Sequence, residues 1–219
     1  MVLINPNTSA ATTATMTAIA RRSLGPALPV RGVTVARGPR MLTDPESLRA
    51  AAPEVLAAGL RAASEGDCAA LLVAAFGDPG VPALRAASTV PVVGIGEAAL
   101  LEAAADGTRF GIATTTPLLA DTIHARVIAL GLADRYTGLR LTAGAPERLS
   151  ADPELLLDRL ERAVRACAER DGAEAVVIGG GPLGEAAERL QARCAVRVVA
   201  PIPAACRAVT RLLAVRSRG

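Results

Sequence analysis

The 219-residue chain carries a net charge of +3, and 51% of its residues are apolar, which is enough to bury a sizeable core in one large or two small domains. All 24 basic residues are arginine, so the chain has neither the Schiff-base lysine of a pyridoxal phosphate enzyme nor the lysine of a Walker A loop. The arginines are scattered and aromatic residues make up 1% of the chain, which argues against a nucleic-acid partner.

The histidine and cysteine content argues against a metal site. His124 is the single histidine, and the cysteines at positions 68, 167, 194 and 206 lack the paired spacing of zinc ligands. We therefore expect neither a metal nor a cofactor. The longest apolar run, 68–76, is shorter than a membrane span, and the chain enters its first apolar segment without a charged leader. A cytoplasmic protein with reduced cysteines and no membrane partner is the expectation.

Eight short β-branched segments alternate with stretches of helical periodicity. In chain order, strands are predicted near 2–5, 32–36, 69–75, 91–94, 109–113, 138–142, 174–179 and 196–200. Each is followed by a turn and, in most cases, by an Ala-, Leu- and Arg-rich segment typical of a helix. This alternation predicts an α/β fold in which helices cover parallel sheets.

The second half of the chain repeats the first at an offset of 105 to 108 positions. Asp44-Pro45-Glu46 recurs as Asp152-Pro153-Glu154, and each triplet has the capping Asp and first-turn Pro that begin a long helix. Segment 71–75 aligns with 176–180, and segment 90–93 aligns with 196–199. Three matches in the same order are difficult to attribute to shared composition alone.

The repeat predicts two duplicated flavodoxin-like lobes. Each lobe is expected to hold a parallel four-stranded sheet, and the two lobes are expected to be related by a pseudo-twofold axis with a cleft between them. The predicted boundaries are 1–100 for the first lobe and 101–219 for the second. The last helix, about 204–215, is expected to be able to pack back onto the first lobe.

Ligands of open parallel sheets bind beyond the carboxyl ends of the strands, where turns and helix amino termini gather. These termini present N–H groups and partial positive charge, which suit a carboxylate, an imide oxygen or an enolate. In the turn after the predicted strand at 109–113, Thr116 precedes Pro117 and is expected to cap a helix. The predicted substrate-binding residues lie in four such turns: Asn5, Asn7, Thr8, Ala75, Phe76, Gly77, Thr114, Thr115, Thr116, Gly179, Gly180 and Gly181.

Three ionisable side chains are candidates for chemistry. Asp78 follows a predicted strand end and is a candidate base, acid or hydrogen-bond acceptor, although an Asp before Pro79 also suits the start of a helix. Glu97 complements the dipole of the helix that it begins. His124 is a residue of the type most used in acid–base catalysis, but it lies mid-helix, where a surface or packing role is the alternative.

Three segments carry a resemblance to a known family. Ile4-Asn5-Pro6-Asn7-Thr8-Ser9, Phe76-Gly77-Asp78-Pro79-Gly80 and Val92-Val93-Gly94-Ile95-Gly96-Glu97-Ala98 resemble motifs of the hydantoin racemases, within the aspartate/glutamate racemase superfamily. The resemblance spans the chain. It implies a cofactor-independent isomerase in which two cysteines, on opposite faces of the substrate carbon, remove and return its proton. The motifs put these cysteines at Ala75 and Gly180, which the internal offset of 105 also relates.

Neither Ala75 nor Gly180 carries an acid, and no other cysteine is predicted at a strand end that could replace them. Cys68 begins a predicted strand on the opposite edge, and the remaining three lie in or just after predicted helices. Segment 94–99 loosely matches a dinucleotide fingerprint but lacks the acidic residue about 20 positions on.

The predicted substrate is a small hydantoin-like or amino-acid-derived carboxylate, processed through an enolate-like intermediate that backbone N–H groups and threonines hold. Because both thiols are absent, one-base isomerisation, decarboxylation and carbon–nitrogen bond cleavage stay open. A non-catalytic small-anion binding protein is the alternative from another class. A homo-oligomer is compatible with the sequence.

Overall fold

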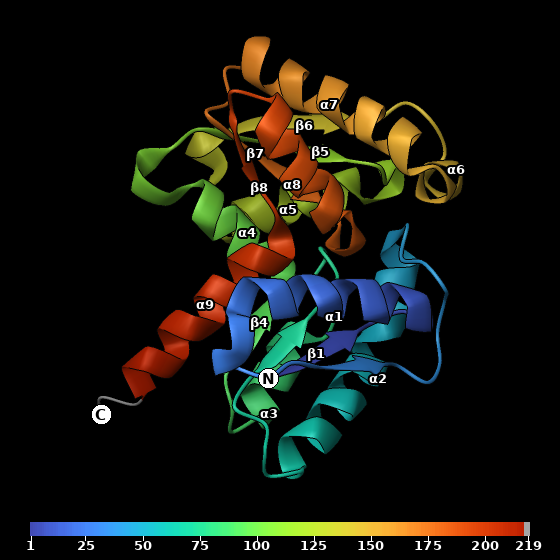
Figure 1. Ribbon diagram of the computed structural model, residues 1–219, viewed down its shortest axis with the longest axis vertical. Helices are drawn as coiled ribbons and strands as arrows, with labels where there is room; N and C mark the ends of the chain where they lie inside the picture. The colour runs from blue at the N-terminus through green and yellow to red at the C-terminus, as the bar shows by residue number, and fades with distance from the viewer. Residues whose placement is uncertain (217–219) are drawn as a thin grey trace. The chain divides into compact units, whose positions relative to one another are not determined.

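The computed structural model describes residues 1–216 and divides the chain into two compact units. Unit 1 comprises residues 1–98 together with 202–216, and unit 2 comprises residues 99–201 (Figure 1). The chain passes between the units twice, once inside helix α4 (Ile95–Ala103) and once at the start of helix α9 (Pro201–Arg216).

Unit 1 is built on a four-stranded parallel sheet in the order β2-β1-β3-β4. Its strands are β1 (Val2–Asn5), β2 (Arg31–Thr34), β3 (Leu71–Val73) and β4 (Val92–Gly94). Besides α9 and the start of α4, its helices are α1 (Ala10–Leu24), η1 (Gly25–Ala27), α2 (Pro45–Ser64) and α3 (Val81–Ala87).

Unit 2 has the same architecture, with a parallel sheet in the order β6-β5-β7-β8. Its strands are β5 (Phe110–Thr114), β6 (Tyr136–Leu141), β7 (Ala175–Gly179) and β8 (Arg197–Val199). Its α-helices after α4 are α5 (Ala120–Ala129), α6 (Pro146–Ala151), α7 (Pro153–Glu169) and α8 (Gly184–Arg193). The 3-10 turns are η2 (Ala105–Gly107), η3 (Pro117–Leu119), η4 (Ala133–Arg135) and η5 (Gly181–Leu183).

The strand register confirms the internal duplication. Leu71 of β3 pairs with Val92 of β4, and the corresponding residues of unit 2, Val176 and Val198, pair with each other. All eight predicted strands are present, and each observed end lies within two residues of the predicted one. The offset of 105 therefore makes Ala75 and Gly180 equivalent positions in the two sheets.

The two Asp-Pro-Glu triplets begin helices as predicted. The Asp44 carboxylate accepts a hydrogen bond from the Ser47 amide at 2.8 Å, and Pro45 is the first residue of α2. The Asp152 carboxylate accepts from the Leu155 amide at 3.0 Å, and α7 begins at the next residue. In both units, this cap begins the long helix that follows the edge strand β2 or β6.

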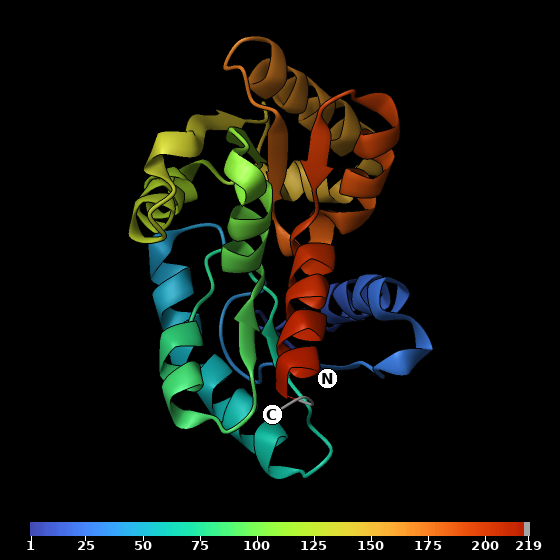
Figure 2. The ribbon, with the colours of Figure 1, turned by 90° about the vertical axis from the view of Figure 1, so that its left-hand side faces the viewer.

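Alternate residues of each strand pack on opposite faces of the sheet, as the two-residue period of a strand requires. In unit 1, Leu3 and Leu72 lie in one buried cluster with residues of α1 and α9. Figure 2 shows these two helices, in dark blue and red, on the same side of the unit 1 sheet. Ile4 and Val73 lie in the other cluster, with residues of α2 and α3. In unit 2, Ile178 and its neighbours on one face pack against α7 and α8.

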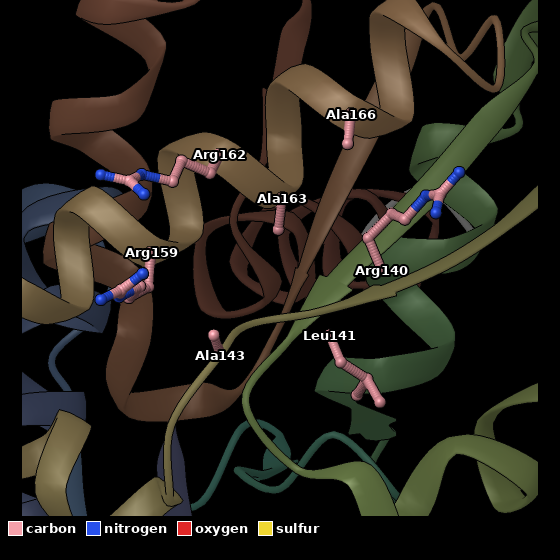
Figure 3. A pocket seen from close by; sticks show the side chains of 7 residues that line it. All are labelled: Arg140, Leu141, Ala143, Arg159, Arg162, Ala163 and Ala166. Carbon is pink, nitrogen blue, oxygen red and sulfur yellow. The ribbon is translucent and has the colours of Figure 1, made fainter.

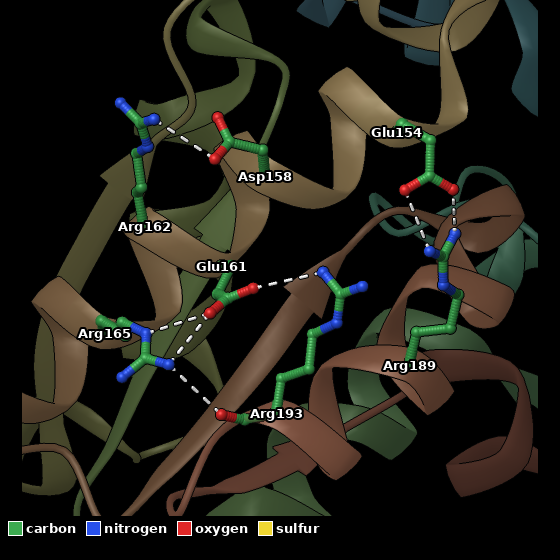
Figure 4. A network of polar contacts seen from close by, with 7 residues as sticks. All are labelled: Glu154, Asp158, Glu161, Arg162, Arg165, Arg189 and Arg193. Carbon is green, nitrogen blue, oxygen red and sulfur yellow. Dashed lines mark hydrogen bonds and ion pairs between the residues drawn. The ribbon is translucent and has the colours of Figure 1, made fainter.

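Ion pairs join α7 to α8, the helix that follows the turn at Gly179–Gly181 (Figure 4). Arg189 holds the Glu154 carboxylate with two hydrogen bonds of 2.8 and 3.0 Å. Glu161 contacts Arg165 of its own helix at 2.9 Å and Arg193 of α8 at 3.4 Å. Because these groups are partly exposed, each pair adds little to the free energy of unfolding. Within residues 1–216, no helix is long and apolar enough to cross a membrane.

Replacing Ile4 by Ala should lower the free energy of unfolding of unit 1 by about 2–5 kcal/mol, because the fully buried side chain leaves a cavity in the core. Leu60→Ala is the matched control. Its side chain is 38% exposed on α2, so its truncation should cost about 0.5 kcal/mol. Urea unfolding followed by circular dichroism measures both, and equal losses would contradict the full burial of Ile4.

Candidate functional site

The turn after β1 is held together by its own side chains. Asn5 is fully buried, and its Nδ2 donates to Asn7 Oδ1 at 2.8 Å, to the Ser9 carbonyl at 3.1 Å and to Thr13 Oγ1 at 3.0 Å. Its Oδ1 accepts from the Asn7 amide at 3.1 Å, and Asn7 Oδ1 accepts from the Ser9 amide at 2.9 Å. Asn5 and both these amides are therefore already occupied by contacts within the turn.

Thr8 connects this turn to the loop after β2. Its amide donates to the Pro39 carbonyl at 3.1 Å, and its hydroxyl lies 3.4 Å from the same oxygen. The sequence predicted Asn5, Asn7 and Thr8 as substrate-binding residues. In the structure, their hydrogen bonds shape the turn and its neighbouring loop.

The turn after β3 is organised around Asp78. This side chain is 4% exposed, and its two oxygens accept hydrogen bonds from the Gly96 amide at 2.9 Å and the Glu97 amide at 2.7 Å. Asp78 therefore caps α4 rather than the helix that follows it in sequence. The prediction that it suits the start of its own helix was wrong, because α3 begins at Val81 after Gly80, whose φ of 74° places it in the left-handed region.

Three further amides of the same turn make no hydrogen bond to another part of the described chain. The Ala75 carbonyl accepts from the Asp78 amide at 2.9 Å. The amides of Ala75, Phe76 and Gly77 have no acceptor among residues 1–216. Phe76 is buried, whereas Ala75 and Gly77 are half-buried. The predicted site residues of this turn thus supply main-chain donors.

The turn after β5 is fixed by hydroxyl groups. Thr114 is fully buried, and its Oγ1 donates to the Gly179 carbonyl at 2.8 Å and lies 3.1 Å from Thr116 Oγ1. Thr116 does not cap η3 with its side chain, so that prediction was wrong. The hydroxyl bonds to Thr114 instead. The half-buried Thr115 and Thr116 have amides without an acceptor in the described chain.

In the turn after β7, packing excludes a side chain at Gly179 but can accommodate one at Gly180. A Cβ on Gly179 would lie 2.9 Å from the Thr114 Cβ, so a side chain there would disturb the hydroxyl contact. Gly180 has a φ of 176°, which is extended backbone open to any residue, and a Cβ there would meet the flexible Leu183 side chain at 2.8 Å. The Gly180 amide donates to the Ile178 carbonyl, whereas the buried Gly181 amide has no acceptor in the described residues.

His124 and Glu97 have partners away from these amides. His124 is half-buried on α5, and its ring centroid lies 5.3 Å from that of Tyr136, the first residue of β6. It therefore lies near the amino end of a strand, opposite to the turns just described. Glu97 lies in the first turn of α4, as predicted, and contacts Arg85 at 3.3 Å.

All four cysteines are buried. Burial raises the pKa of the Cys167 and Cys206 thiols to about 12, and it also raises the pKa of Cys68 and Cys194. Cys68 precedes β3 at the amino edge of its sheet, and the other three lie in or directly after helices. None of them is placed at a strand carboxyl end. Among residues 1–216, no group of three His, Cys, Asp or Glu side chains could hold a metal ion.

A hollow of about 250 Å³, which the sequence did not predict, lies between β6 and α7 (Figure 3). Its arginines are engaged elsewhere: Arg140 binds Asp171, and Arg162 binds Asp158. Figure 3 shows Arg140 pointing away from Arg159 and Arg162, so the three guanidinium groups do not converge on one ligand. The residues that line it are Arg140, Leu141, Ala143, Arg159, Arg162, Ala163 and Ala166.

In the folded protein at pH 8, none of the four thiols should react with Ellman's reagent within minutes. A thiol with a pKa of about 12 is ionised to roughly one part in ten thousand at that pH, whereas an ordinary thiol is about one-quarter ionised. All four should react after unfolding in urea, which serves as the control. Fast labelling of one thiol in the native protein would contradict its placement in the core.

Comparison with known proteins places the chain in a family. A family model described as Asp/Glu/Hydantoin racemase matches residues 1–209. The chain is 28% identical over 214 residues to the hydantoin racemase of Paenarthrobacter aurescens, covering 98% of this chain and 91% of that protein. It is 30% identical over 217 residues to the hydantoin racemase of Rhizobium meliloti, covering 96% and 87%. The structure of allantoin racemase from Klebsiella pneumoniae matches with a TM-score of 0.93 and 29% identity, covering 98% and 87%. The chain is therefore an enzyme of the Asp/Glu/hydantoin racemase family.

Proposed function

We propose that the chain acts on a small hydantoin-like or amino-acid-derived molecule through an enolate-like intermediate, without a cofactor. The observation that carries this proposal is the set of main-chain amides without acceptors at the strand carboxyl ends. These amides belong to Ala75, Phe76, Gly77, Thr115, Thr116 and Gly181. The names of the relatives, hydantoin racemase and allantoin racemase, support the substrate class.

Such amides suit an enolate because of where its charge develops. Removal of a proton, or of carbon dioxide, from a carbon next to a carbonyl group puts negative charge on the carbonyl oxygen. Fixed N–H donors stabilise that charge without having to reorganise during the reaction. The half-buried Thr115 adds a hydroxyl group that can bind a carboxylate. The Thr116 hydroxyl donates to Thr114, whose own hydrogen goes to the Gly179 carbonyl, so Thr116 Oγ1 can accept from a bound water molecule.

This chain lacks both thiols of the mechanism that the resemblance implies, so any base must come from another group. Ala75 and Gly180 have no ionisable side chain, and both oxygens of Asp78 hold amides of α4. We therefore propose a reaction that does not pass a proton between two thiols. One-base exchange through bound water, decarboxylation and carbon–nitrogen cleavage all meet this condition. The missing acids also favour one candidate of another kind, a protein that binds a small anion without turnover.

A screen of 5-substituted hydantoins should distinguish turnover from binding. In deuterium oxide, the enzyme should exchange the proton at C5 faster than a protein-free blank, because an amide-held enolate lowers the barrier to its removal. Proton NMR measures the exchange, and polarimetry shows whether inversion accompanies it. Exchange no faster than the blank, together with a raised melting temperature, would contradict the proposal and support the small-anion binding protein.

Ala75→Cys combined with Gly180→Cys should confer or greatly raise racemisation, whereas each single change should do much less. Inversion needs an acid or base on each face of the carbon, and these two positions are equivalent in the duplicated sheets. The extended backbone at Gly180 accepts a side chain. Polarimetry on an enantiopure hydantoin measures the result.

The control for this experiment is the Ala75→Ser and Gly180→Ser double variant, which adds side chains of similar size without a thiolate. Racemisation that rises equally in both double variants would show that thiol chemistry is not responsible. A folded double-cysteine variant without racemisation would contradict the proposal that this site binds hydantoins.

A further inference from the structure

Asp78 has a backbone conformation that few non-glycine residues adopt. Its φ is 49°, and Asp106 is the only other non-glycine residue in the described chain with a positive φ. Such a conformation persists where the surrounding contacts enforce it, and it often accompanies a functional constraint. Here the enforcing contacts are the two hydrogen bonds from the Gly96 and Glu97 amides.

Two glycines of β4 and α4 make room for this contact. A Cβ on Gly94 would lie 2.3 Å from Asp78 Oδ1, and a Cβ on Gly96 would lie 2.0 Å from the Phe76 carbonyl oxygen. The Gly-Ile-Gly spacing, which loosely matches a dinucleotide fingerprint, therefore lets the Asp78 turn approach the start of α4. Any side chain at either position would separate the two segments.

The contact also fixes the direction of the free amides. In a trans peptide, the C=O and N–H groups point in opposite directions, and the described residues contain no cis peptide. The Ala75 carbonyl is directed to the Asp78 amide, and the Phe76 carbonyl lies against Gly96. The amides of Phe76 and Gly77, which share these two peptides, must therefore point away from the clamp.

Unit 2 achieves the same helix start without a clamp. Leu183 occupies the position equivalent to Asp78, and the strand register places Ala200 and Ile202 at the positions equivalent to Gly94 and Gly96. Pro201 and Pro203 are equivalent to Ile95 and Glu97. Proline has no N–H, so the start of α9 has fewer donors to satisfy. The fold therefore does not require an Asp clamp at this place, and its presence in unit 1 needs another explanation.

We propose that Asp78 is a positioning residue that clamps the turn after β3 onto α4 and thereby directs the amides of Phe76 and Gly77 toward the substrate. The inference rests on the proposed function, in which these amides hold the enolate oxygen. It assigns Asp78 a role through the main chain rather than a proton transfer of its own.

A thiol introduced at position 75 provides a probe that needs no substrate. In an Ala75→Cys background, the rate of alkylation by iodoacetamide is followed against pH, and the four native thiols are buried. Neighbouring amides should lower the pKa of the introduced thiol. Asn can accept a hydrogen bond from only one of the two amides, so adding Asp78→Asn should loosen the turn and raise the pKa of the introduced thiol. The alkylation rate at pH 7 should then fall by threefold or more, because less thiolate is present.

Asp44→Ala is the matched control, since Asp44 also caps a helix but contacts Ser47 rather than this turn. It should lower stability and leave the alkylation profile unchanged. Gly96→Ala is the second variant. It disrupts the clamp from the α4 side while Asp78 is retained, so it should shift the profile in the same direction as Asp78→Asn.

An unchanged profile in folded Asp78→Asn, or an equal change in the Asp44→Ala control, would overturn the proposal. Hydantoin exchange tests the proposed function separately. If exchange is found, Asp78→Asn without the introduced thiol should lower kcat by tenfold or more and change KM less than threefold. If the parent shows no exchange but the thiol profile responds, the clamp stands and the proposed function fails.

Discussion

Asn5 and Thr114 end β1 and β5, the first strand of each sheet in chain order, and both side chains are fully buried. A polar group buried at a strand end must find a partner within the protein, because water cannot reach it. Asn5 finds three acceptors within its own turn and the first turns of α1, whereas Thr114 donates across to the carbonyl of Gly179. The Asn5 contacts hold the turn after β1 and occupy its Asn7 amide, whereas the Thr114 contact ties the turn after β5 to the end of β7.

The two units share one architecture but differ in which turns hold amides without an acceptor. In unit 1, the turn after β1 is closed by its own hydrogen bonds, and the free amides lie in the turn after β3. In unit 2, the turn after β5 keeps free amides at Thr115 and Thr116, whereas the glycine turn keeps one at Gly181. Strand order and register are shared by the two units, but the partners of a few buried side chains distinguish them.

Most of the fold could be predicted from the sequence, because the periodicity of apolar residues and the Asp-Pro helix starts are local signals. The capping role of Asp44 was read correctly, since its partner is three residues away. The partner of Asp78 is Gly96, 18 residues along the chain, and no local pattern reports such a contact. The same difficulty explains Thr116, whose hydroxyl bonds to Thr114 instead of capping a helix.

One signal for the Asp78 clamp was present in the sequence. Glycines at positions 94 and 96 flank one isoleucine, and such a pair often marks a close approach of another segment. The spacing also loosely matches a cofactor motif, and spacing alone does not indicate which segment approaches. The internal repeat carries a second signal, because the equivalent positions hold Ala200 and Ile202, whose side chains indicate that unit 2 lacks this close approach.

The glycines of the site also show which features of this enzyme are imposed by packing. Gly96 and Gly179 are required, because a Cβ at either position would meet a main-chain oxygen or the Thr114 side chain at 2.9 Å or less. Gly180 is different, since its backbone is extended and its nearest neighbour is a flexible leucine. The fold therefore leaves room for an acid at position 180, and Ala75 already carries a Cβ. The packing at these two positions therefore does not require the absence of a thiol at either of them.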